Sequence, residues 1–282
     1  MKDAARKPHR GRDRAITDGG AAARGRKDRR PANRSEAGSG LVWLYGRHAG
    51  AAALANPERR IKRAFATKNA LDWLKTQNIS ETRIVKIEDA RPDAIDRLLP
   101  AGAVHQGLAV ETSDLERARL KDVCLISDDR RPVVVLDQIT DPQNIGAVFR
   151  SAAAFGARAA IVQERRTPPL SGALAKAAAG AVETLPCVKA VNIARALEAL
   201  KDLGYHCAGL AGQSDTPISA LPTDKPVAIV LGAEGAGLRQ LVGETCDALY
   251  RIPIAREMES LNVSNAAAIA LYEATRNAGG DD

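Results

Sequence analysis

Short apolar runs alternate with stretches of helical periodicity through the second half of the chain. Val133 to Leu136 is a β-branched run between Pro132 and Asp137, and Val227 to Leu231 is a second run of the same kind, so both predict buried strands. Two further strands are expected at Ala159 to Val162 and Cys207 to Leu210, and helices at Gly172 to Ala181, Ala194 to Leu203 and Ala266 to Thr275. Strands that alternate with helices indicate an α/β fold with a parallel sheet.

The segment from residue 40 to 112 predicts a second, smaller α/β unit of about 75 residues. Its pattern predicts helices at Pro57 to Ala66, Asn69 to Gln77 and Arg91 to Leu98, and strands at Ile84 to Ile87 and Leu108 to Val110. Residues 113 to 130 are dense in charge and are expected to form a linker, in which a helix-forming stretch from Leu115 to Lys121 indicates a semi-rigid connector.

Charge is distributed unevenly along the chain. The net charge is +7, and residues 1 to 40 hold 12 basic and 5 acidic residues, so this segment carries the whole excess. Residues 1 to 39 have almost no large apolar side chains, so they cannot bury a core and are expected to be disordered. An arm that binds phosphates is one interpretation, and a tail that only improves solubility is the alternative.

Polar residues follow the first of the two β-branched runs. Asp141 and Pro142 form a turn pair, and Asn144 precedes an apolar-periodic stretch that ends at Gly156, so Asn144 is expected to cap a helix. Capping alone would explain this asparagine. Arg150 lies between apolar neighbours near the expected core-facing stripe, and such a charge must pair with a carboxylate, a phosphate or a carbonyl. A structural salt bridge and a functional role both fit.

A glycine-rich loop follows the second β-branched run. Gly232, Gly235 and Gly237 permit positive φ and close approach of a ligand to the backbone. The dinucleotide motif G-x-G-x-x-G fails at Gln240, and the Gly-Lys-Ser/Thr ending of a P-loop is absent. Glu234 would repel phosphate, which favours a ligand with a cationic or hydroxyl-bearing part; a strained turn with a solvated glutamate is the alternative.

Four polar residues cluster before the last expected helix. Ser260, Asn262, Ser264 and Asn265 surround Leu261 and Val263 in the sequence. One of the four must cap the helix that follows, which leaves three without a structural reason. These three indicate a binding role.

The three motifs, DPQNIGAVFRSAAAFG, GAEGAGL and IP…SLNVSNAAAIALYEA, resemble in order and spacing the signature motifs of the SpoU/TrmH family of RNA ribose 2′-O-methyltransferases within the SPOUT superfamily. The match covers residues 131 to 278. LYGRHA at residues 44 to 49 and VHQG at residues 104 to 107 are similar to the start and end of the small N-terminal domain in the subgroup that methylates a guanosine of 23S ribosomal RNA.

The resemblance implies a C-terminal α/β-knot domain with a deep trefoil knot and a parallel sheet. Residues 40 to 112 would then be a ribosomal-protein-like (L30e-like) domain that binds the RNA substrate. The resemblance also implies a homodimer whose active site uses both subunits. A knot is not something that periodicity would predict, since threaded chains are rare.

The resemblance assigns roles to individual positions. S-adenosylmethionine would be held at Gly232, Ile252 and Leu261, with Leu210, Ala211 and Gly212 lining the same pocket. The polar positions around the target ribose match Asn144, Arg150, Glu234, Ser260 and Asn262. The residues expected to contact RNA in the N-terminal domain are Arg47, His48, His105 and Gln106. Arg256, Glu257, Met258 and Glu259 depart from the family pattern, which has small residues there, and are expected to be a local variation.

Composition excludes several other classes of protein. Four histidines and four cysteines show no metal-ligand spacing, so no metal is expected. Unpaired, scattered cysteines fit a reducing cytoplasm, and no apolar run reaches membrane-span length. The aromatic content of 3% argues against a base-stacking platform. Two alternatives stay open: a transfer-RNA methyltransferase, and an RNA-binding member of the fold that has lost catalysis.

Overall fold

The computed structural model describes residues 41–77, 86–126, 129–255 and 257–277, which belong to a compact unit spanning Ala37–Asp282. The predicted disordered tail, residues 1 to 39, lies outside the described residues. So do residues 84 and 85 of the predicted strand Ile84 to Ile87; its last residue, Ile87, begins strand β3.

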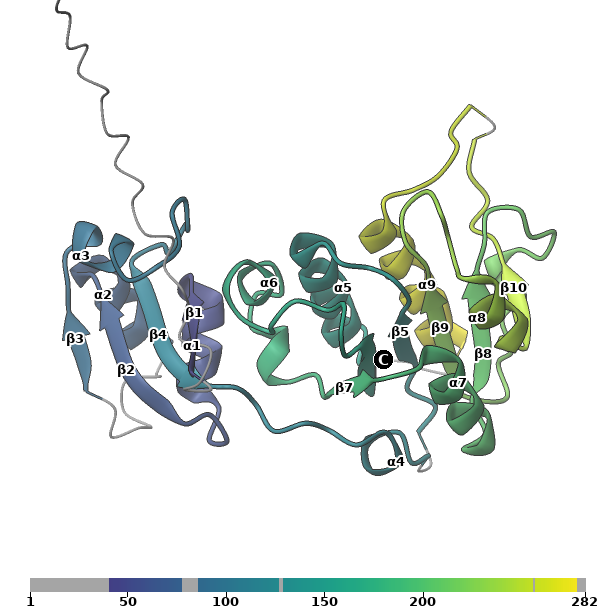
Figure 1. Cartoon of the computed structure of the whole chain (residues 1–282), viewed down its shortest axis with the longest axis horizontal. Helices are drawn as coiled ribbons and strands as arrows, with labels where there is room; N and C mark the ends of the chain where they lie inside the picture. The colour runs from purple at the N-terminus through teal and green to yellow at the C-terminus, as the bar shows by residue number, and fades with distance from the viewer. Residues whose placement is uncertain (1–40, 78–85, 127–128, 256, 278–282) are drawn as a thin grey trace, which may run out of the picture. The chain divides into compact units, whose positions relative to one another are not determined.

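The second half of the chain forms a six-stranded sheet in which every neighbouring pair is parallel (Figure 1). The strands, in the order of the sheet, are β10 (Ala248–Tyr250), β8 (His206–Leu210), β9 (Val227–Leu231), β5 (Val133–Leu136), β6 (Ala159–Gln163) and β7 (Cys187–Ala190). The four predicted strands are confirmed, and β7 and β10 are additions. The β-branched runs are the two central strands, whose residues are all buried. Continuous apolar runs are expected where helices cover both faces of a sheet.

Helices cover the sheet on both faces. The helical segments, in chain order, are α4 (Leu120–Val123), α5 (Pro142–Ala154), α6 (Gly172–Ala177), η1 (Ala181–Glu183), α7 (Ile193–Asp202), η2 (Ile218–Ala220), α8 (Gln240–Thr245) and α9 (Val263–Asn277). Val134 and Leu136 share a hydrophobic cluster with α5 and α9, whereas Val133 and Val135 share another with α7. The strand residues therefore alternate between the two cores, as a pleated strand requires.

The first half forms a separate four-stranded sheet in the order β1-β4-β2-β3. Its elements are β1 (Leu41–Tyr45), α1 (Arg47–Ala55), β2 (Ile61–Ala66), α2 (Lys68–Thr76), β3 (Ile87–Asp89), α3 (Pro92–Asp96) and β4 (Leu108–Ser113). β4 pairs antiparallel with β1 and β2, and β2 pairs parallel with β3. This unit is therefore α/β, as predicted, and the predicted helix at Asn69 to Gln77 is confirmed as α2.

Two predicted helices in this half are wrong. Residues 61 to 66 of the stretch Pro57 to Ala66 form strand β2, because they pair with β4 and direct Ala64 and Ala66 into the core. Tertiary pairing outweighs the local helix propensity of alanine, lysine and arginine. In the linker, Leu115 to Arg119 is not helical and the helix is the short α4. Neither β1 nor α1 was expected.

His206, at the start of β8, makes stability depend on pH. Its Nε2 lies 2.9 Å from the Tyr250 hydroxyl, and burial lowers the pKa of the imidazole, with Asp247 opposing that shift. A lowered pKa in the folded state means that folding favours the neutral ring, so this contribution is complete above the unfolded pKa of about 6.5 and is lost as pH falls below it. We expect wild type to lose more stability than His206→Gln between pH 7.5 and pH 5, measured by urea unfolding. His48→Gln, at an exposed histidine, is the control, and an identical pH dependence of wild type and His206→Gln would contradict this assignment.

Candidate functional site

Three connections leave the carboxyl ends of β5, β9 and β10 and lie at the same edge of the sheet. β5 leads into α5, β9 leads through the glycine-rich loop 232–238 into α8, and β10 leads through residues 251–262 into α9. Parallel strands place their carboxyl ends together, and this edge is where open α/β sheets bind ligands. The three sequence motifs therefore share one edge.

The start of α5 differs from the prediction in one residue. Asp141, not Asn144, is the N-cap: its carboxylate accepts hydrogen bonds from the backbone N–H groups of Gln143 and Asn144. Pro142 takes the first helical position, where a missing N–H costs nothing. The prediction that Asn144 caps this helix is wrong, and its side-chain amide is free to act elsewhere.

The side chains of Asn144, Glu234 and Asn262, one from each motif, form what we call the amide–carboxylate cluster. Nδ2 of Asn144 donates to Oε1 of Glu234 at 3.1 Å. Nδ2 of Asn262 donates to the same oxygen at 3.0 Å and to Oδ1 of Asn144 at 2.9 Å. Within the described residues, Oε2 of Glu234 accepts no hydrogen bond, so the cluster presents one carboxylate oxygen to a ligand.

Asn262 also fixes the start of α9. Its Oδ1 accepts hydrogen bonds from the backbone N–H of Ser264 at 2.9 Å and from the Ser264 hydroxyl at 2.5 Å. This confirms that one of the four polar residues caps the helix, and it also accounts for Ser264. Because one side chain serves both the helix start and the cluster, the helix position sets the amide position. Ser260 and Asn265 are exposed.

The glycine-rich loop folds back on itself in a tight hairpin. Ala233 and Gly237 form a pair of backbone hydrogen bonds at 3.1 and 2.8 Å, with Gly235 and Gly237 at positive φ. Gly232 lies directly against the returning strand of this hairpin: a Cβ added to it would overlap the Gly237 backbone and the Leu238 nitrogen. Glycine at 232 is therefore required by the loop itself, and the hairpin lifts Glu234 into its exposed tip.

The expected cofactor positions lie together at this edge. Leu210 pairs in register with Tyr250, and the backbone N–H of Ala211 donates to the Tyr250 carbonyl at 2.9 Å, which brings residues 210–212 beside Ile252. Gly232 follows β9, the other neighbour of β8. Within the described residues, no backbone hydrogen bond is recorded for Gly232, Ile252 or Leu261, and all three are partly exposed. Unpaired backbone groups at a strand edge fit a ligand held by its polar atoms.

Arg150 lies apart from the cluster. It is exposed on α5, whereas the sequence placed it near the core-facing stripe, and no hydrogen bond or ion pair is recorded for it in the described part of the chain. It follows Asn144 by six residues, which is about 240° around a helix, so the two side chains leave α5 on different sides. Of the two interpretations of Arg150, the structural salt bridge finds no support in the described residues, and the expected place near the core-facing stripe is wrong.

The four residues expected to contact RNA lie close together at one end of the first sheet. Arg47 donates from Nε to the Gln106 carbonyl at 3.4 Å, and its backbone N–H donates to the Gln106 side chain at 3.2 Å. His105 accepts a hydrogen bond from the Gly107 N–H at Nδ1 (2.9 Å) and lies 3.2 Å from Asp96 at Nε2. Arg47, His105 and Gln106 line a hollow of about 640 Å³, and exposed His48 lies outside it.

Sequence reasoning missed other residues of this surface. Trp73 carries the Arg47 guanidinium over its ring at 5.8 Å and meets the His48 ring edge-on at 5.6 Å. Thr67, Asn69 and Asp96 line the same hollow as Arg47. Trp73 lies on a partly exposed face of α2, three residues after the buried Ala70. The signal in the sequence was a tryptophan within the predicted helix Asn69 to Gln77. Spacing in the sequence could not show that α1 and α2 meet there.

An ion pair between a buried carboxylate and a half-exposed arginine lies beside two of the motifs. The Asp137 carboxylate, directly after β5, is fully buried and accepts hydrogen bonds from Arg239, directly after the glycine-rich loop. Neither residue was expected at the site. The available signals were an aspartate directly after a buried strand and an arginine directly after the GAEGAGL motif.

Other chemistry finds no support among the described residues. They contain no group of three or more His, Cys, Asp or Glu side chains that could hold a metal ion. All four cysteines are unpaired, and burial raises the pKa of Cys207 and Cys246 to about 12, so these thiols are poor nucleophiles. None of the helices in the described part of the chain has the length and apolar character of a membrane span.

Of the four residues that depart from the family pattern, Arg256 lies outside the described residues, and Glu257, Met258 and Glu259 are exposed.

Comparison with known proteins agrees with this arrangement. Residues 131–272 match the model of the SpoU rRNA Methylase family, and residues 43–118 match the model for RNA 2′-O ribose methyltransferase substrate binding. The chain is 43% identical over 173 residues to the 23S rRNA (guanosine-2′-O-)-methyltransferase RlmB of a Burkholderia species, covering 61% of this chain and 70% of that protein. It is 37% identical over 237 residues to RlmB of Photobacterium profundum, covering 83% of this chain and 96% of that protein.

The fold has a solved counterpart. The SpoU methyltransferase AviRb from Streptomyces viridochromogenes, crystallised in complex with AdoMet, superimposes with a TM-score of 0.69 at 23% identity, over 84% of this chain and 90% of AviRb. At this identity the likeness shows the fold. The family match spans half of the chain, and a relative more than 30% identical is covered almost completely. The chain therefore belongs to the SpoU rRNA methylase family and is a methyltransferase.

Proposed function

We propose that this enzyme transfers a methyl group from S-adenosylmethionine to the ribose 2′-hydroxyl of a guanosine in 23S ribosomal RNA. The observation that carries the proposal is the amide–carboxylate cluster, in which one side chain from each of the three motifs converges at the ligand-binding edge of the sheet. The RlmB relatives support the choice of a guanosine in 23S ribosomal RNA, because they are named as 23S rRNA (guanosine-2′-O-)-methyltransferases.

The donor fits the residues at this edge. Unpaired backbone groups of Gly232, Ile252 and Leu261 would hold its polar atoms, with residues 210–212 along the same pocket. S-adenosylmethionine supplies a methyl carbon made electrophilic by a sulfonium, which departs as a neutral thioether. Since the leaving group is neutral, this chemistry needs no metal; it needs in-line geometry and a path for the hydroxyl proton.

The cluster orients the acceptor. Oε2 of Glu234 is free to accept a hydrogen bond from a ribose hydroxyl, while Asn144 and Asn262 hold the other carboxylate oxygen and so fix the direction of the first. Ser260, exposed next to the start of α9, adds a hydroxyl on the same side. Arg150 stabilises the developing alkoxide as a cation, since arginine is a poor base, and the proton leaves to a phosphate or water.

Arg150 requires a second copy of the chain. It leaves α5 on a different side from Asn144 and makes no recorded contact with the cluster in the described residues, so a site that uses both needs Arg150 from a partner subunit. A homodimer with shared sites meets this requirement. We also propose that this domain contains the trefoil knot of the family; the packing of α9, which Asn262 immediately precedes, against α5 is compatible with it. Four unpaired cysteines are in keeping with a cytoplasmic protein.

The domains that contain the two sheets have different proposed roles. Residues 40 to 112 bind the RNA substrate, with Arg47, His48, His105 and Gln106 as contacts; 113 to 130 form the linker, and 131 to 278 catalyse the transfer. The match of residues 43–118 to a substrate-binding model supports this division. The hollow beside Arg47 has several hydrogen-bonding side chains among its lining residues, which suits an RNA strand recognised by shape and hydrogen bonds.

The basic segment at the start of the chain gives a separate prediction. Deleting residues 1 to 38 removes the whole excess of positive charge, so we expect weaker RNA binding and a shallower dependence of log Kd on log salt, with the same nucleotide methylated. Filter binding between about 50 and 200 mM salt measures both quantities. An unchanged affinity and slope would leave the segment with a solubilising role only.

The test of the function is a methylation assay. The purified protein is incubated with radiolabelled S-adenosylmethionine and unmodified 23S ribosomal RNA, and any 2′-O-methyl group is mapped. A single methylated guanosine is the expected result. Label on transfer RNA alone would keep the chemistry and reassign the substrate, and no label on any RNA would favour an RNA-binding member that has lost catalysis.

A further inference from the structure

Asp137 is a buried carboxylate with a specific partner. It ends β5 with no exposed surface, and a charge in that position is stable only when it is paired and hydrogen-bonded. Arg239 supplies the partner: Nη2 and Nε lie 2.6 and 3.0 Å from Oδ1, and the backbone N–H of Arg239 donates to Oδ2 at 3.2 Å. The aspartate thus fixes both the side chain and the backbone of Arg239.

The same aspartate holds the other end of the glycine-rich loop. Its backbone N–H donates to the carbonyl of Leu231 at 2.8 Å, and Leu231 is the last residue of β9 before the loop begins. Arg239 is the first residue after the loop and the N-cap of α8. Asp137 therefore binds the entry of the loop with its backbone and the exit with its carboxylate, so the two ends of the loop 232–238 are held by the one residue that follows β5.

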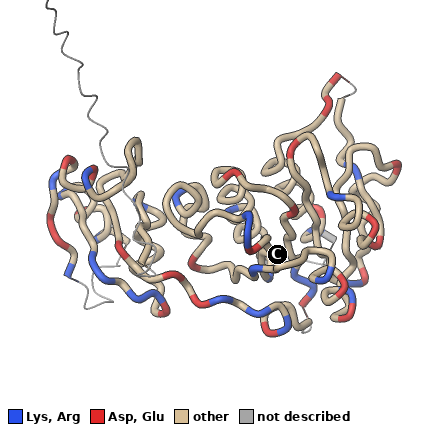
Figure 2. The backbone as a smooth tube through the Cα atoms, viewed as in Figure 1, with Lys and Arg blue, Asp and Glu red and all other residues tan. Residues whose placement is uncertain are grey.

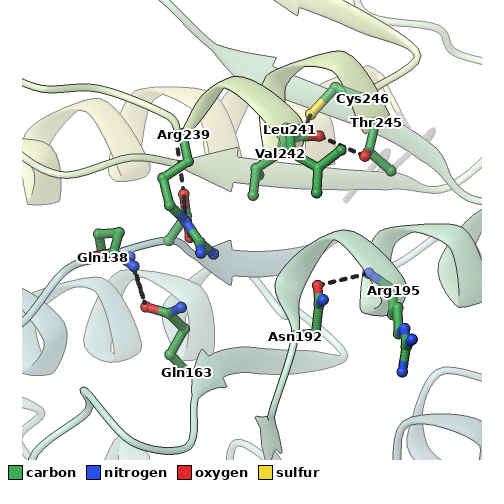
Figure 3. A network of polar contacts seen from close by, with 10 residues as sticks. Gln138, Gln163, Asn192, Arg195, Arg239, Leu241, Val242, Thr245 and Cys246 are labelled. Carbon is green, nitrogen blue, oxygen red and sulfur yellow. Dashed lines mark hydrogen bonds and ion pairs between the residues drawn. The ribbon is translucent and has the colours of Figure 1, made fainter.

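The position of Asp137 is itself fixed from the opposite side. Gln138, the next residue, has a left-handed φ of 60°, which is costly for a residue with a side chain. Its backbone N–H and Nε2 donate to Oε1 of Gln163, at the end of β6, at 3.3 and 3.1 Å (Figure 3). The turn that directs the chain out of β5 is therefore held by β6, while the aspartate just before it is held to β9.

We propose that Asp137 and Arg239 are positioning residues that set the shape of the loop 232–238, and through it the placement of Glu234 and the affinity for the methyl donor. The loop tip carries Glu234, whose Oε1 has to meet two amide donors at about 3 Å, so a displaced loop loses both. The effect on donor affinity rests on the proposed function, whereas the effect on loop shape does not.

The variants separate the loop from the general stability of the fold. Arg239→Ala alone would leave a buried carboxylate unpaired, so the test uses the double variant Asp137→Asn/Arg239→Ala, which removes both charges. Arg239→Lys keeps the charge but loses the planar fork and is the conservative variant. The matched control is Lys201→Ala, because Lys201 donates to the Thr245 carbonyl at 2.8 Å and so holds the opposite end of α8.

Two measurements follow on the full-length protein. Hydrogen–deuterium exchange without any ligand reports on the amides of 232–239, and calorimetric titration with S-adenosylmethionine reports the Kd. For the double variant we expect loop amides to exchange about tenfold faster with β5 and β9 still protected. We expect its Kd to rise about tenfold, which is the order of effect of one lost hydrogen bond. Arg239→Lys should recover part of both, and Lys201→Ala should change neither.

The outcomes distinguish this proposal from the proposed function. Unchanged loop exchange in the double variant would overturn the positioning role, whatever the enzyme methylates. Equal loss of protection throughout β5, β9 and the loop, with an unaltered Kd in the folded protein, would make the pair a stabilising ion pair and also overturn it. If wild type itself fails to bind S-adenosylmethionine, the proposed function fails, while the exchange data still decide whether the pair shapes the loop.

Discussion

Arg150→Ala is expected to lower kcat by about 100- to 1,000-fold, the range seen when one group that stabilises a developing oxyanion is removed. The fold should be unaffected, since the Arg150 side chain is exposed on α5 and has no recorded partner in the described residues. A loss of this size with unchanged thermal unfolding would identify a group that acts in the reaction and not in folding. Methyl transfer to 23S ribosomal RNA under saturating donor measures kcat.

Two further variants define what Arg150 contributes. Arg150→Lys keeps a cation but loses the planar fork, so an intermediate kcat is expected if charge and geometry both matter. Arg195→Ala is the matched control, because Arg195 is also an exposed arginine on a helix, α7, and its guanidinium makes no hydrogen bond or ion pair with the described residues. Turnover of Arg150→Ala close to wild type would remove Arg150 from the mechanism.

A mixed dimer tests whether Arg150 serves the partner subunit. A dimer that combines one Arg150→Ala subunit with one Asn262→Ala subunit should recover up to half of the wild-type activity if Arg150 of one chain works with the cluster of the other, because one intact site remains. Each variant alone should be inactive. If the residues of a site came from one chain, both sites of the mixed dimer would be defective and activity would stay at the level of the single variants.

The parallel sheet was predictable because its central strands are buried on both faces. Both are continuous apolar runs, Val133 to Leu136 and Val227 to Leu231. Such runs are typical of parallel strands that helices cover on both faces. Ile61 to Ala66 was not predictable in the same way. Lys62 and Arg63 interrupt its apolar residues, and only pairing with β4 decides that this segment is a strand.

The convergence of the three motifs was predictable, but the contacts within it were not. Strand ends share an edge in any parallel sheet, so Asn144, Glu234 and Asn262 could be placed near each other from sequence. The identity of the helix cap could have been read from Pro142, which favours the first helical position and so assigns the cap to Asp141. The pair Asp137 and Arg239 is separated by 102 positions, and no local pattern links such residues.

Gly232→Ala is expected to weaken donor binding strongly. The cause would be a change in the shape of the loop 232–238, and not a methyl group that fills the pocket. The added Cβ would overlap the backbone of Gly237 and the nitrogen of Leu238, and backbone atoms cannot move aside as a flexible side chain can. The hairpin between Ala233 and Gly237 must open, which displaces Glu234 from both amide donors. We expect the Kd for S-adenosylmethionine to rise by about 100-fold or more, since misplacement of contact groups by about 1 Å costs that much.

Two other glycines separate this loop effect from a direct clash with the donor. A Cβ on Gly212 would meet no protein atom within 4 Å, so if residues 210–212 line the pocket, Gly212→Ala should weaken donor binding while unfolding stays as in wild type. Gly243, inside α8, is equally open and is not a proposed pocket residue; Gly243→Ala should leave binding unchanged and stabilise the protein by about 0.5–1 kcal/mol. Calorimetry and thermal unfolding on the three variants therefore give three distinct results. Wild-type affinity in Gly232→Ala would mean that the loop can reshape without cost and that its hairpin does not hold the cofactor site.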